Sequence, residues 1–342
     1  MESGAGEAAN YEDGAYRAAG AVVSSRGEAA SVADLVLTVN GVTESDAAAF
    51  KQSATVVGFL GPLDDPGLIS ALAGRGLSLF AVEMIPRITR AQGMDTLSSM
   101  ATIAGYKAAL LAAAHAPRLF PLMMTAAGTL TPAKVFVIGV GVAGLQAIAT
   151  ARRLGALVEG YDIRPEVKEQ VESLGAAFVE LDVGMERVTG SGGYAARQST
   201  EYYRRQQEAL GKHLSGVDVI ITTAAVPGRK APMLLPSAIS DRLRPGTVVV
   251  DLAAERGGNC ALTEPGKTVV VNGVIVDGPV NLPSSVPSHA SEMYSKNMLN
   301  LASVLIKEGE MHLDLEDEIV CGALVAHGGS VTHPAVRQAL DA

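Results

Sequence analysis

Residues 134–149 read KVFVIGVGVAGLQAIA, in which an apolar, β-branched run meets three glycines and continues as a helix-like stretch. The spacing Gly139-x-Gly141-x-x-Gly144 is the dinucleotide fingerprint when a strand precedes it and a helix follows. Gly139 permits the tight turn, Gly141 lets the backbone approach a pyrophosphate, and Gly144 lets helix and strand pack closely. Free N–H groups at the start of the helix favour phosphates. The stretch predicts a βαβ unit that binds a nicotinamide or flavin dinucleotide.

The next expected strand ends at Asp162, 23 residues after Gly139. A carboxylate there accepts hydrogen bonds from adenosine ribose hydroxyls and repels a 2′-phosphate, so it favours NAD over NADP. Because of Arg164, binding of NADP instead of NAD stays open as the minority alternative. The Arg164 side chain can also lie along the adenine or pair with Asp162. A glycine-rich turn with no ligand is the other alternative, and the full strand–turn–helix context makes it the weaker one.

The composition indicates a globular chain of two domains. The chain has 342 residues, of which 48% are hydrophobic and 18% charged, and this length exceeds one ordinary core. The net charge of −9, without clustered Lys and Arg, argues against a nucleic-acid surface. Two cysteines, Cys260 and Cys321, are too few for a disulfide framework and favour a reducing compartment. The histidines lack metal-ligand spacing, so we expect no metal.

No apolar stretch has the length expected of a bilayer span. The best candidate, residues 108–128, is interrupted by His115, Pro117, Arg118 and Pro121. We therefore expect a soluble chain, which can still dock on a membrane partner. Met123 and Met124 are interpreted as packing residues.

The order of strand-like and helix-like stretches predicts an α/β fold of two Rossmann-like domains with parallel sheets. Two long helices would join the domains, with a cleft between them. The helix at 98–116 is read as a connecting helix rather than a core helix, with Ser98 and Ser99 as caps. A hairpin is expected to turn at Gly328-Gly329. The expected divisions are a discontinuous N-terminal domain (1–97 and 309–342), a linker helix and connection (98–133), an NAD-binding domain (134–290) and a return helix (291–308).

Strands are expected in both domains, and the ends of parallel strands face a ligand crevice. Polar loops at 87–98, 190–195, 222–228 and 254–260 are candidate site segments. Each has a plain alternative: a solvated turn, a flexible linker, or an ordinary strand-to-helix turn. The expected strands are 34–39, 55–60 and 77–83 in the first domain, and 134–139, 157–162, 177–182, 217–224, 246–253, 268–273 and 274–278 in the second.

Read together, PRITRAQGMDTLSSMATIAGYKA, MMTAAGT, GVGVAGLQAIATARRLGA, TTAAVPGRKAP and DLAAERGGNC closely resemble the proton-translocating NAD(P) transhydrogenase family, in its NAD(H)-binding component. The resemblance runs from about Asp34 nearly to the C-terminus. It implies that NADH on this chain gives hydride to NADP⁺ held by a partner component, while a separate membrane-spanning component couples the step to proton translocation. It also implies a homodimer, cytoplasmic and peripheral on the inner or plasma membrane through its partner.

The resemblance also implies residue roles. Arg87, Gln92 and Asp95 would reach the nicotinamide and its ribose, with Gln92 also contacting the partner's NADP(H). They would position the reacting groups without acid–base chemistry. Gly193 and Tyr194 match a mobile loop whose tyrosine closes over NAD(H). The remaining cofactor-binding candidates are Thr96, Leu97, Ser98, Gly139, Gly141, Val142, Ala143, Gly144, Asp162, Ile163, Arg164, Thr223, Ala224 and Asn259.

Two other functions remain open at this point. Alanine dehydrogenase shares the fold and holds its substrate with a lysine and a histidine, but Thr38 and Phe59 stand at those places. A 2-oxo acid would then lack a cationic clamp and an acid–base group. A non-catalytic NAD-binding module is the second alternative. The family's first strand and helix have no counterpart in MESGAGEAAN, so we expect the first domain to lack that unit.

Overall fold

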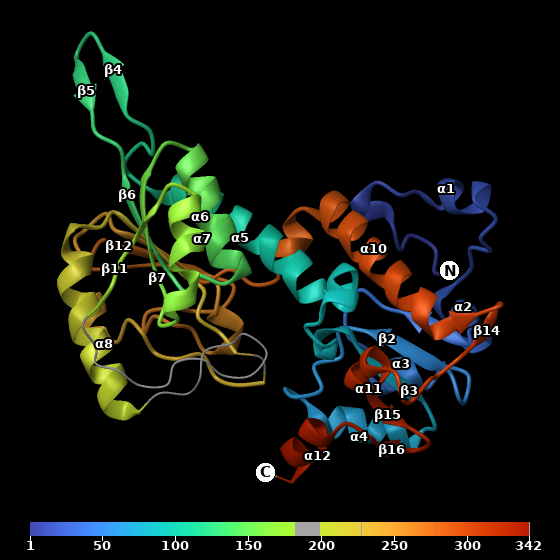
Figure 1. Cartoon of the computed structure of the whole chain (residues 1–342). Coiled ribbons are helices and arrows are strands. Elements are labelled where there is room, and N and C mark those ends of the chain that lie inside the picture. Colours follow the sequence, from blue (N-terminus) through green and yellow to red (C-terminus); the bar gives the residue numbers. More distant parts are fainter. Residues whose placement is uncertain (182–198, 227, 342) are drawn as a thin grey trace. The chain divides into compact units, whose positions relative to one another are not determined.

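The computed structural model describes residues 1–181, 199–226 and 228–341. The chain divides into two compact units (Figure 1). Unit 1 comprises Met1–Met100 and Val286–Ala342, and unit 2 comprises Ala101–Ser285. Each unit has its own main sheet, as expected for an α/β fold with two Rossmann-like domains.

The main sheet of unit 2 has the strand order β11-β12-β10-β9-β6-β7-β8. Its centre is β6 (Lys134–Ile138), which pairs in parallel with β9 (Val219–Thr222) and β7 (Leu157–Tyr161). The strand order reverses between β6 and β9, which is the switch point where doubly wound sheets bind ligands. The other strands are β8 (Ala177–Phe178), β10 (Val248–Asp251), β11 (Thr268–Val271) and β12 (Val274–Asp277).

The central strands of unit 2 are continuous Val and Ile runs because helices cover both sheet faces. All four residues of β9 and all four of β10 are buried, and full burial of each such side chain stabilises the fold by about 1.5–3 kcal/mol. The helices are α6 (Val142–Arg153), η4 (Pro165–Val167), α7 (Lys168–Ser173), α8 (Thr200–His213), η6 (Leu214–Gly216), α9 (Ser237–Ser240), η7 (Ala254–Arg256) and η8 (Leu282–Ser285).

The sheet of unit 1 has the order β1-β2-β3-β15-β16. Its first three strands, β1 (Leu35–Leu37), β2 (Thr55–Gly58) and β3 (Ser78–Ala81), are parallel as expected. Next come β15 (Leu324–His327) and β16 (Ser330–Val331), which form the predicted hairpin with positive φ at both glycines of its turn. Since β15 is antiparallel to β3 and β11 is antiparallel to β12, neither sheet is parallel throughout.

The helices of unit 1 are mostly short. They are η1 (Glu7–Ala9), α1 (Asp13–Ala18), α2 (Arg26–Val32), α3 (Glu44–Ala47), α4 (Pro66–Gly74), η2 (Val82–Met84), η3 (Thr89–Met94), α10 (Pro287–Leu305), α11 (Glu318–Ala323) and α12 (Pro334–Leu340). Three of them, η1, α1 and α2, precede the first strand of the sheet, and α12 follows the last.

Both predicted long helices are present, with shifted ends. Helix α5 (Thr96–His115) begins before Ser98, so the prediction that Ser98 and Ser99 cap it is wrong. The cap is Asp95, whose carboxylate accepts the Ser98 N–H at 2.8 Å and the Ser98 hydroxyl at 2.6 Å. The return helix α10 starts at a proline and stops at Leu305, because the chain then forms a short hairpin of β13 (Ile306–Lys307) and β14 (Glu310–Met311).

Helix α5 also corrects two expectations. Its Ala108, Ala109 and Ala112 are fully buried in a core cluster of unit 2, so the helix is not merely a connection outside the core. It is also long and apolar enough to cross a membrane, judged by length and composition alone. No such stretch was expected from the sequence, but core helices of folded proteins meet the same criterion.

Gly105 is the point where α5 meets the first turn of α6. A Cβ atom added at Gly105 would lie 2.1 Å from the carbonyl oxygen of Ala143, which no side chain tolerates. The two helices therefore touch backbone to backbone at the turn that carries the glycine fingerprint.

A hairpin that the sequence analysis did not predict extends from unit 2 (Figure 1). It consists of β4 (Met123–Thr125) and β5 (Gly128–Leu130) and pairs with neither main sheet. Met124 is 80% exposed. The interpretation of Met123 and Met124 as packing residues is therefore wrong for this chain by itself.

Candidate functional site

The fingerprint turn of unit 2 fits glycine at each of its three positions. Gly139 has φ +91°, and a Cβ there would lie 2.7 Å from the Thr223 hydroxyl oxygen. A Cβ on Gly144 would lie 1.9 Å from the carbonyl oxygen of Gly139. At Gly141 a Cβ would meet no atom within 4 Å. The open space at Gly141 leaves the backbone accessible to a pyrophosphate.

The start of α6 provides the second element of an anion site. Gly141 is its N-cap and supplies no side-chain cap. Val142, the first helical residue, is 37% exposed. The N–H groups of the first turn of a helix lack partners within the helix and carry its positive dipole end. Val142 and Ala143 therefore present their backbone to the place where a dinucleotide phosphate would fit.

Asp162 lies beside this turn and holds it. Its Oδ2 accepts the Val140 N–H at 2.8 Å, and its Oδ1 accepts the Arg164 N–H at 2.9 Å. The Arg164 guanidinium also donates to both oxygens, from Nε at 2.9 Å and from Nη2 at 2.8 Å. This hydrogen bonding to Asp162 raises the pKa of Arg164. Of the alternatives left open for Arg164, pairing with Asp162 is the one that the structure adopts, and Ile163 lies half-buried between them.

The end of β9 is held by two different side chains. The Thr223 hydroxyl donates to the Gly139 carbonyl at 2.7 Å, which links this strand end to the glycine turn. The Ala224 N–H donates to Asn259 Oδ1 at 3.0 Å, and Asn259 Nδ2 donates to the carbonyls of Ala224 and Pro232 at 2.8 Å each. Asn259 is fully buried, so its effect on a ligand would pass through Ala224.

A fully buried carboxylate, Asp251, supports this arrangement and was missed by the sequence analysis. It accepts the Asn259 N–H at 2.7 Å and the hydroxyls of Thr222 at 2.9 Å and Thr263 at 2.6 Å. The signal was available, because a charged residue ending a buried strand requires several partners.

The loop of unit 1 that contains Gln92 is fixed on several sides. Within η3, Ala91 and Met94 are buried while Gln92 is exposed. The Gly93 carbonyl accepts hydrogen bonds from Asn297 Nδ2 and Asn300 Nδ2, both at 2.8 Å, and both asparagines lie on α10. Among the described residues, none forms a hydrogen bond with the Gln92 side chain. The loop thus presents the Gln92 amide from a held backbone.

A bidentate ion pair holds the same loop to α11. Arg90 donates from Nη1 and Nη2 to the two oxygens of Asp317, at 2.8 Å each. Asp317 is also the N-cap of α11 and accepts the Ile319 N–H at 2.8 Å. The hydrogen bonds from Arg90 lower the pKa of Asp317 to about 2.

The other loop candidates differ in exposure. Arg87 is exposed, and Leu97 and Ser98 are half-buried. Thr96 is buried, and its hydroxyl donates a hydrogen bond to the Val82 carbonyl at 3.5 Å. The Thr96 side chain therefore faces the core. Gly193 and Tyr194 lie outside the described residues.

The carboxyl ends of the parallel strands of unit 1 carry neutral groups at the two positions that matter for a dehydrogenase. The Tyr294 hydroxyl donates to the Thr38 carbonyl at 2.6 Å, and the Tyr294 ring stacks on Phe59 with centroids 5.7 Å apart. Glu83, at the end of β3, accepts the Gly61 N–H at 2.6 Å. Burial raises the pKa of Glu83.

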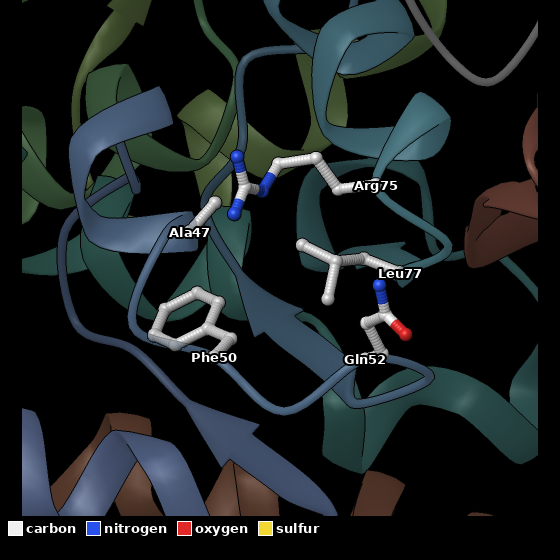
Figure 2. A pocket seen from close by; sticks show the side chains of 5 residues that line it. All are labelled: Ala47, Phe50, Gln52, Arg75 and Leu77. Atoms are coloured by element: carbon white, nitrogen blue, oxygen red, sulfur yellow. The ribbon is translucent and has the colours of Figure 1, made fainter.

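A small pocket lies elsewhere in unit 1, as Figure 2 shows. Its volume is about 250 Å³. It sits at the amino ends of β2 and β3, away from the strand ends that carry the loop of Gln92. The pocket is lined by Ala47, Phe50, Gln52, Arg75 and Leu77.

Among the described residues, no group of three His, Cys, Asp or Glu side chains has the geometry to hold a metal.

Comparisons with known proteins agree with this architecture. The alanine dehydrogenase/PNT N-terminal domain matches residues 1–104, and the alanine dehydrogenase/PNT C-terminal domain matches residues 108–334. An NAD(P) transhydrogenase alpha-subunit chain of Rhodospirillum rubrum is 44% identical, over 98% of this chain and 90% of that protein. An alanine dehydrogenase of Mycolicibacterium smegmatis is 26% identical, over 100% of this chain and 88% of that protein.

Solved structures give the same result. The crystal structure of a transhydrogenase from Sinorhizobium meliloti superposes with a TM-score of 0.86 at 43% identity, covering 96% of this chain and 90% of that one. The two-domain Rossmann-like fold is thereby confirmed, and membership of the family implies NAD(H) binding. The transhydrogenase alpha-subunit chain is more similar to this chain, at 44% identity, than the alanine dehydrogenase, at 26%. The chain therefore belongs to the alanine dehydrogenase/PNT family and is an oxidoreductase of that family.

Proposed function

We propose that this chain holds NADH at the glycine turn of unit 2 and passes its hydride to NADP⁺ held by a separate component. The observation that carries the proposal is the exposed Gln92 amide on a held loop. The Gly93 carbonyl of this loop accepts hydrogen bonds from Asn297 and Asn300, and the Arg90 side chain of the same loop pairs with Asp317. Bound NADH supplies the hydride. Direct transfer requires close approach and orientation rather than an acid or base.

In this proposal the residues of unit 2 hold the nucleotide at its pyrophosphate and at its two riboses. The backbone of Gly141, Val142 and Ala143 binds the pyrophosphate, and Asp162 accepts from the adenosine ribose. Thr223 and Ala224 line the nicotinamide-ribose side. Asn259 acts by fixing Ala224, which its side chain already clamps. Ile163, Arg164, Gly193 and Tyr194 complete the proposed set.

The residues of unit 1 position the nicotinamide. Arg87 and Gln92 have exposed side chains and would make direct contacts, with Gln92 also facing NADP(H) on the partner. The Asp95 carboxylate is occupied by Ser98, so Asp95 would act mainly by fixing the end of this loop. Thr96, Leu97 and Ser98 follow it in the first turn of α5 and would keep the loop end in place.

A stand-alone alanine-type dehydrogenase is less well supported. Its carboxylate substrate needs a cation and its carbonyl needs an acid–base group. The corresponding strand ends carry Thr38 and Phe59, and both contact Tyr294. A non-catalytic NAD-binding module would not require an exposed, fixed Gln92. We therefore place the chain with the transhydrogenase subunits.

The proposed assembly is a homodimer docked, through its partner components, on the cytoplasmic face of a membrane. Support for the homodimer comes from the hairpin of β4 and β5. Leu122 is 56% exposed, Met124 80% and Leu130 49%. A two-stranded hairpin is marginally stable alone in water, so a second copy that covers these side chains would stabilise it. Proton translocation would be the task of the separate membrane-spanning component.

The test is hydride exchange in a mixture of purified components. The chain, NADH, an oxidised NAD analogue of distinct absorbance and a separately purified partner component loaded with NADP⁺ are combined. Hydride passes from NADH to the bound NADP⁺ and from the NADPH so formed to the analogue, whose reduction is followed optically. Exchange that requires both proteins supports the proposal. Gln92→Asn is expected to slow exchange by about tenfold or more while NADH affinity changes much less, because misplacement of reacting groups is costly.

Gln338→Asn, an exposed glutamine on α12, is the matched control and should leave the rate unchanged. Tight NADH binding without exchange would instead identify a binding module. Exchange that is unaffected by Gln92→Asn would remove the role assigned to Gln92.

A further inference from the structure

The carboxylate of Asp162 has no acceptor site left over. An ionised carboxylate offers about four lone-pair sites, and Asp162 receives four hydrogen bonds within 2.9 Å. Two come from the backbone, at Val140 and Arg164, and two from the Arg164 guanidinium. The side chains of both residues are largely buried, with 15% of Arg164 and 7% of Asp162 exposed. A ribose diol that binds Asp162 must therefore displace an existing donor.

The backbone donors and the guanidinium donors differ in how much of the surrounding structure must change when their hydrogen bond to Asp162 is broken. The Val140 N–H follows Gly139 in the fingerprint turn, so its loss would open the turn that binds phosphate. The Arg164 N–H comes from the residue that directly precedes η4. The guanidinium, in contrast, can leave by rotation of side-chain torsions alone. The Arg164 side chain is the donor that can be exchanged for a ribose.

We infer that Arg164 is a displaceable counter-ion of Asp162, and that after displacement it sets the discrimination between NADH and NADPH. The inference rests on the proposed nucleotide site at this turn. With Arg164 in place, the pair has no net charge. A ribose diol that takes two acceptor sites releases the guanidinium beside the 2′ position, where it offsets the repulsion between Asp162 and a 2′-phosphate.

The charges give the direction of the effect. A 2′-phosphate carries about −1.5 to −2 charges near neutral pH. Asp162 alone repels it, whereas an arginine near the ribose accommodates it. Removal of the guanidinium leaves a lone, largely buried carboxylate, and repulsion at such a site is stronger than in water. NADPH affinity should fall, while NADH gains acceptor sites that no longer have to be vacated.

The experiment compares dissociation constants for NADH and NADPH in four forms of the full chain. They are the wild type, Arg164→Gln, Arg164→Lys and, as a control with the same charge change, Arg153→Gln. Arg153 is exposed in the last turn of α6. Binding is followed by NADH fluorescence, with NADPH as competitor. Arg164→Gln should raise the ratio of the NADPH to the NADH dissociation constant about fivefold or more. Arg164→Lys, which keeps the charge, and Arg153→Gln should change it less than about threefold.

A ratio that rises less than fivefold in Arg164→Gln overturns the inference, because a purely structural role would weaken both nucleotides alike. Absence of NADPH binding by the wild type overturns it as well. These outcomes differ from failure of the wild type to bind NADH, which would refute the nucleotide site itself.

A measurement on the wild type does not depend on the folding of a variant. In the free chain, Arg164 Nε–H donates to Asp162 Oδ1 and should exchange slowly with solvent. Its ¹⁵N–¹H resonance is identified by its loss in Arg164→Lys. Addition of NADH should shift this resonance and speed its exchange, and an unchanged resonance at saturating NADH contradicts displacement.

Discussion

Arg90 and Asp317 form a two-pronged ion pair, in which each guanidinium Nη atom lies 2.8 Å from a different carboxylate oxygen. Since Asp317 also caps α11, the pair joins the Gln92 loop to the start of a helix far along the chain. Its geometry is the one in which arginine–carboxylate pairs are strongest.

Asp317→Asn is expected to lower stability at neutral pH without loss of the helix cap, because Asn caps as well as Asp. The folded pKa of Asp317 is depressed to about 2. The stabilisation is therefore fully present above the unfolded pKa of about 3.9 and is lost as the pH falls through the folded value. Urea unfolding at pH 7, 4 and 3 should show a constant difference between variant and wild type down to about pH 4 that then shrinks. A difference that grows below pH 4 would contradict the assignment.

Asn300→Ala is expected to reduce hydride exchange with the partner by several-fold while NADH affinity stays unchanged. It removes one of the two amides that hold the Gly93 carbonyl, so the exposed Gln92 beside it loses its fixed position. The exchange assay and NADH titration measure the two effects separately. Asn40→Ala, at another exposed asparagine of unit 1, is the control. Equal losses of rate and affinity would show that Asn300 does not act through position.

Two glycines of the fingerprint should respond in opposite ways to alanine. Gly144→Ala places a methyl 1.9 Å from the Gly139 carbonyl oxygen and should cost about 1–3 kcal/mol or more of stability through overpacking. Gly141→Ala meets no atom within 4 Å and should fold normally but weaken NADH binding, since the methyl occupies the phosphate approach. Thermal unfolding and NADH titration distinguish them. Unchanged NADH affinity in Gly141→Ala would place the pyrophosphate elsewhere.

Met124→Asp is expected to convert a dimer into a monomer of 35.1 kDa, because it puts a charge on the most exposed apolar residue of the β4–β5 hairpin. Light scattering after gel filtration measures the mass. Val22→Asp is the matched control, as Val22 is also 80% exposed but lies in unit 1. Identical masses for all three forms would show that the hairpin does not form the dimer interface.

The glycine turn and its strands could be predicted because their information is local. Strand, turn, helix and Asp162 lie within some thirty residues, and each glycine has a separate steric reason. The pairing of Arg164 with Asp162 was only one of several alternatives, since periodicity does not fix a side-chain torsion. The cap of α5 was assigned to Ser98 and Ser99 instead of Asp95 for a similar reason: both residue types cap well, and backbone dihedrals decide between them.

Contacts between distant segments were beyond the reach of sequence patterns. The bond from Asn300 to Gly93 spans 207 residues, and the clamp of Asn259 on Ala224 spans 35. The segment 254–260 was a candidate site segment, but its pattern does not show which group Asn259 contacts, and nothing near Asn300 distinguishes it from a surface residue. The β4–β5 hairpin was missed because its apolar residues resemble packing residues, and their exposure is a property of the folded chain alone.

The backbone contact at Gly105 has a consequence for how this protein tolerates change. Where side chains separate two helices, a substitution at one position can be compensated by a substitution at a neighbouring position. The distance between the helices then changes with each substitution. Here the distance between α5 and the start of α6 is set by main-chain atoms, with no room for a methyl. The outer face of α6 is therefore free to vary across homologues and engineered variants without moving the phosphate-facing turn, whereas a single carbon at residue 105 would move it.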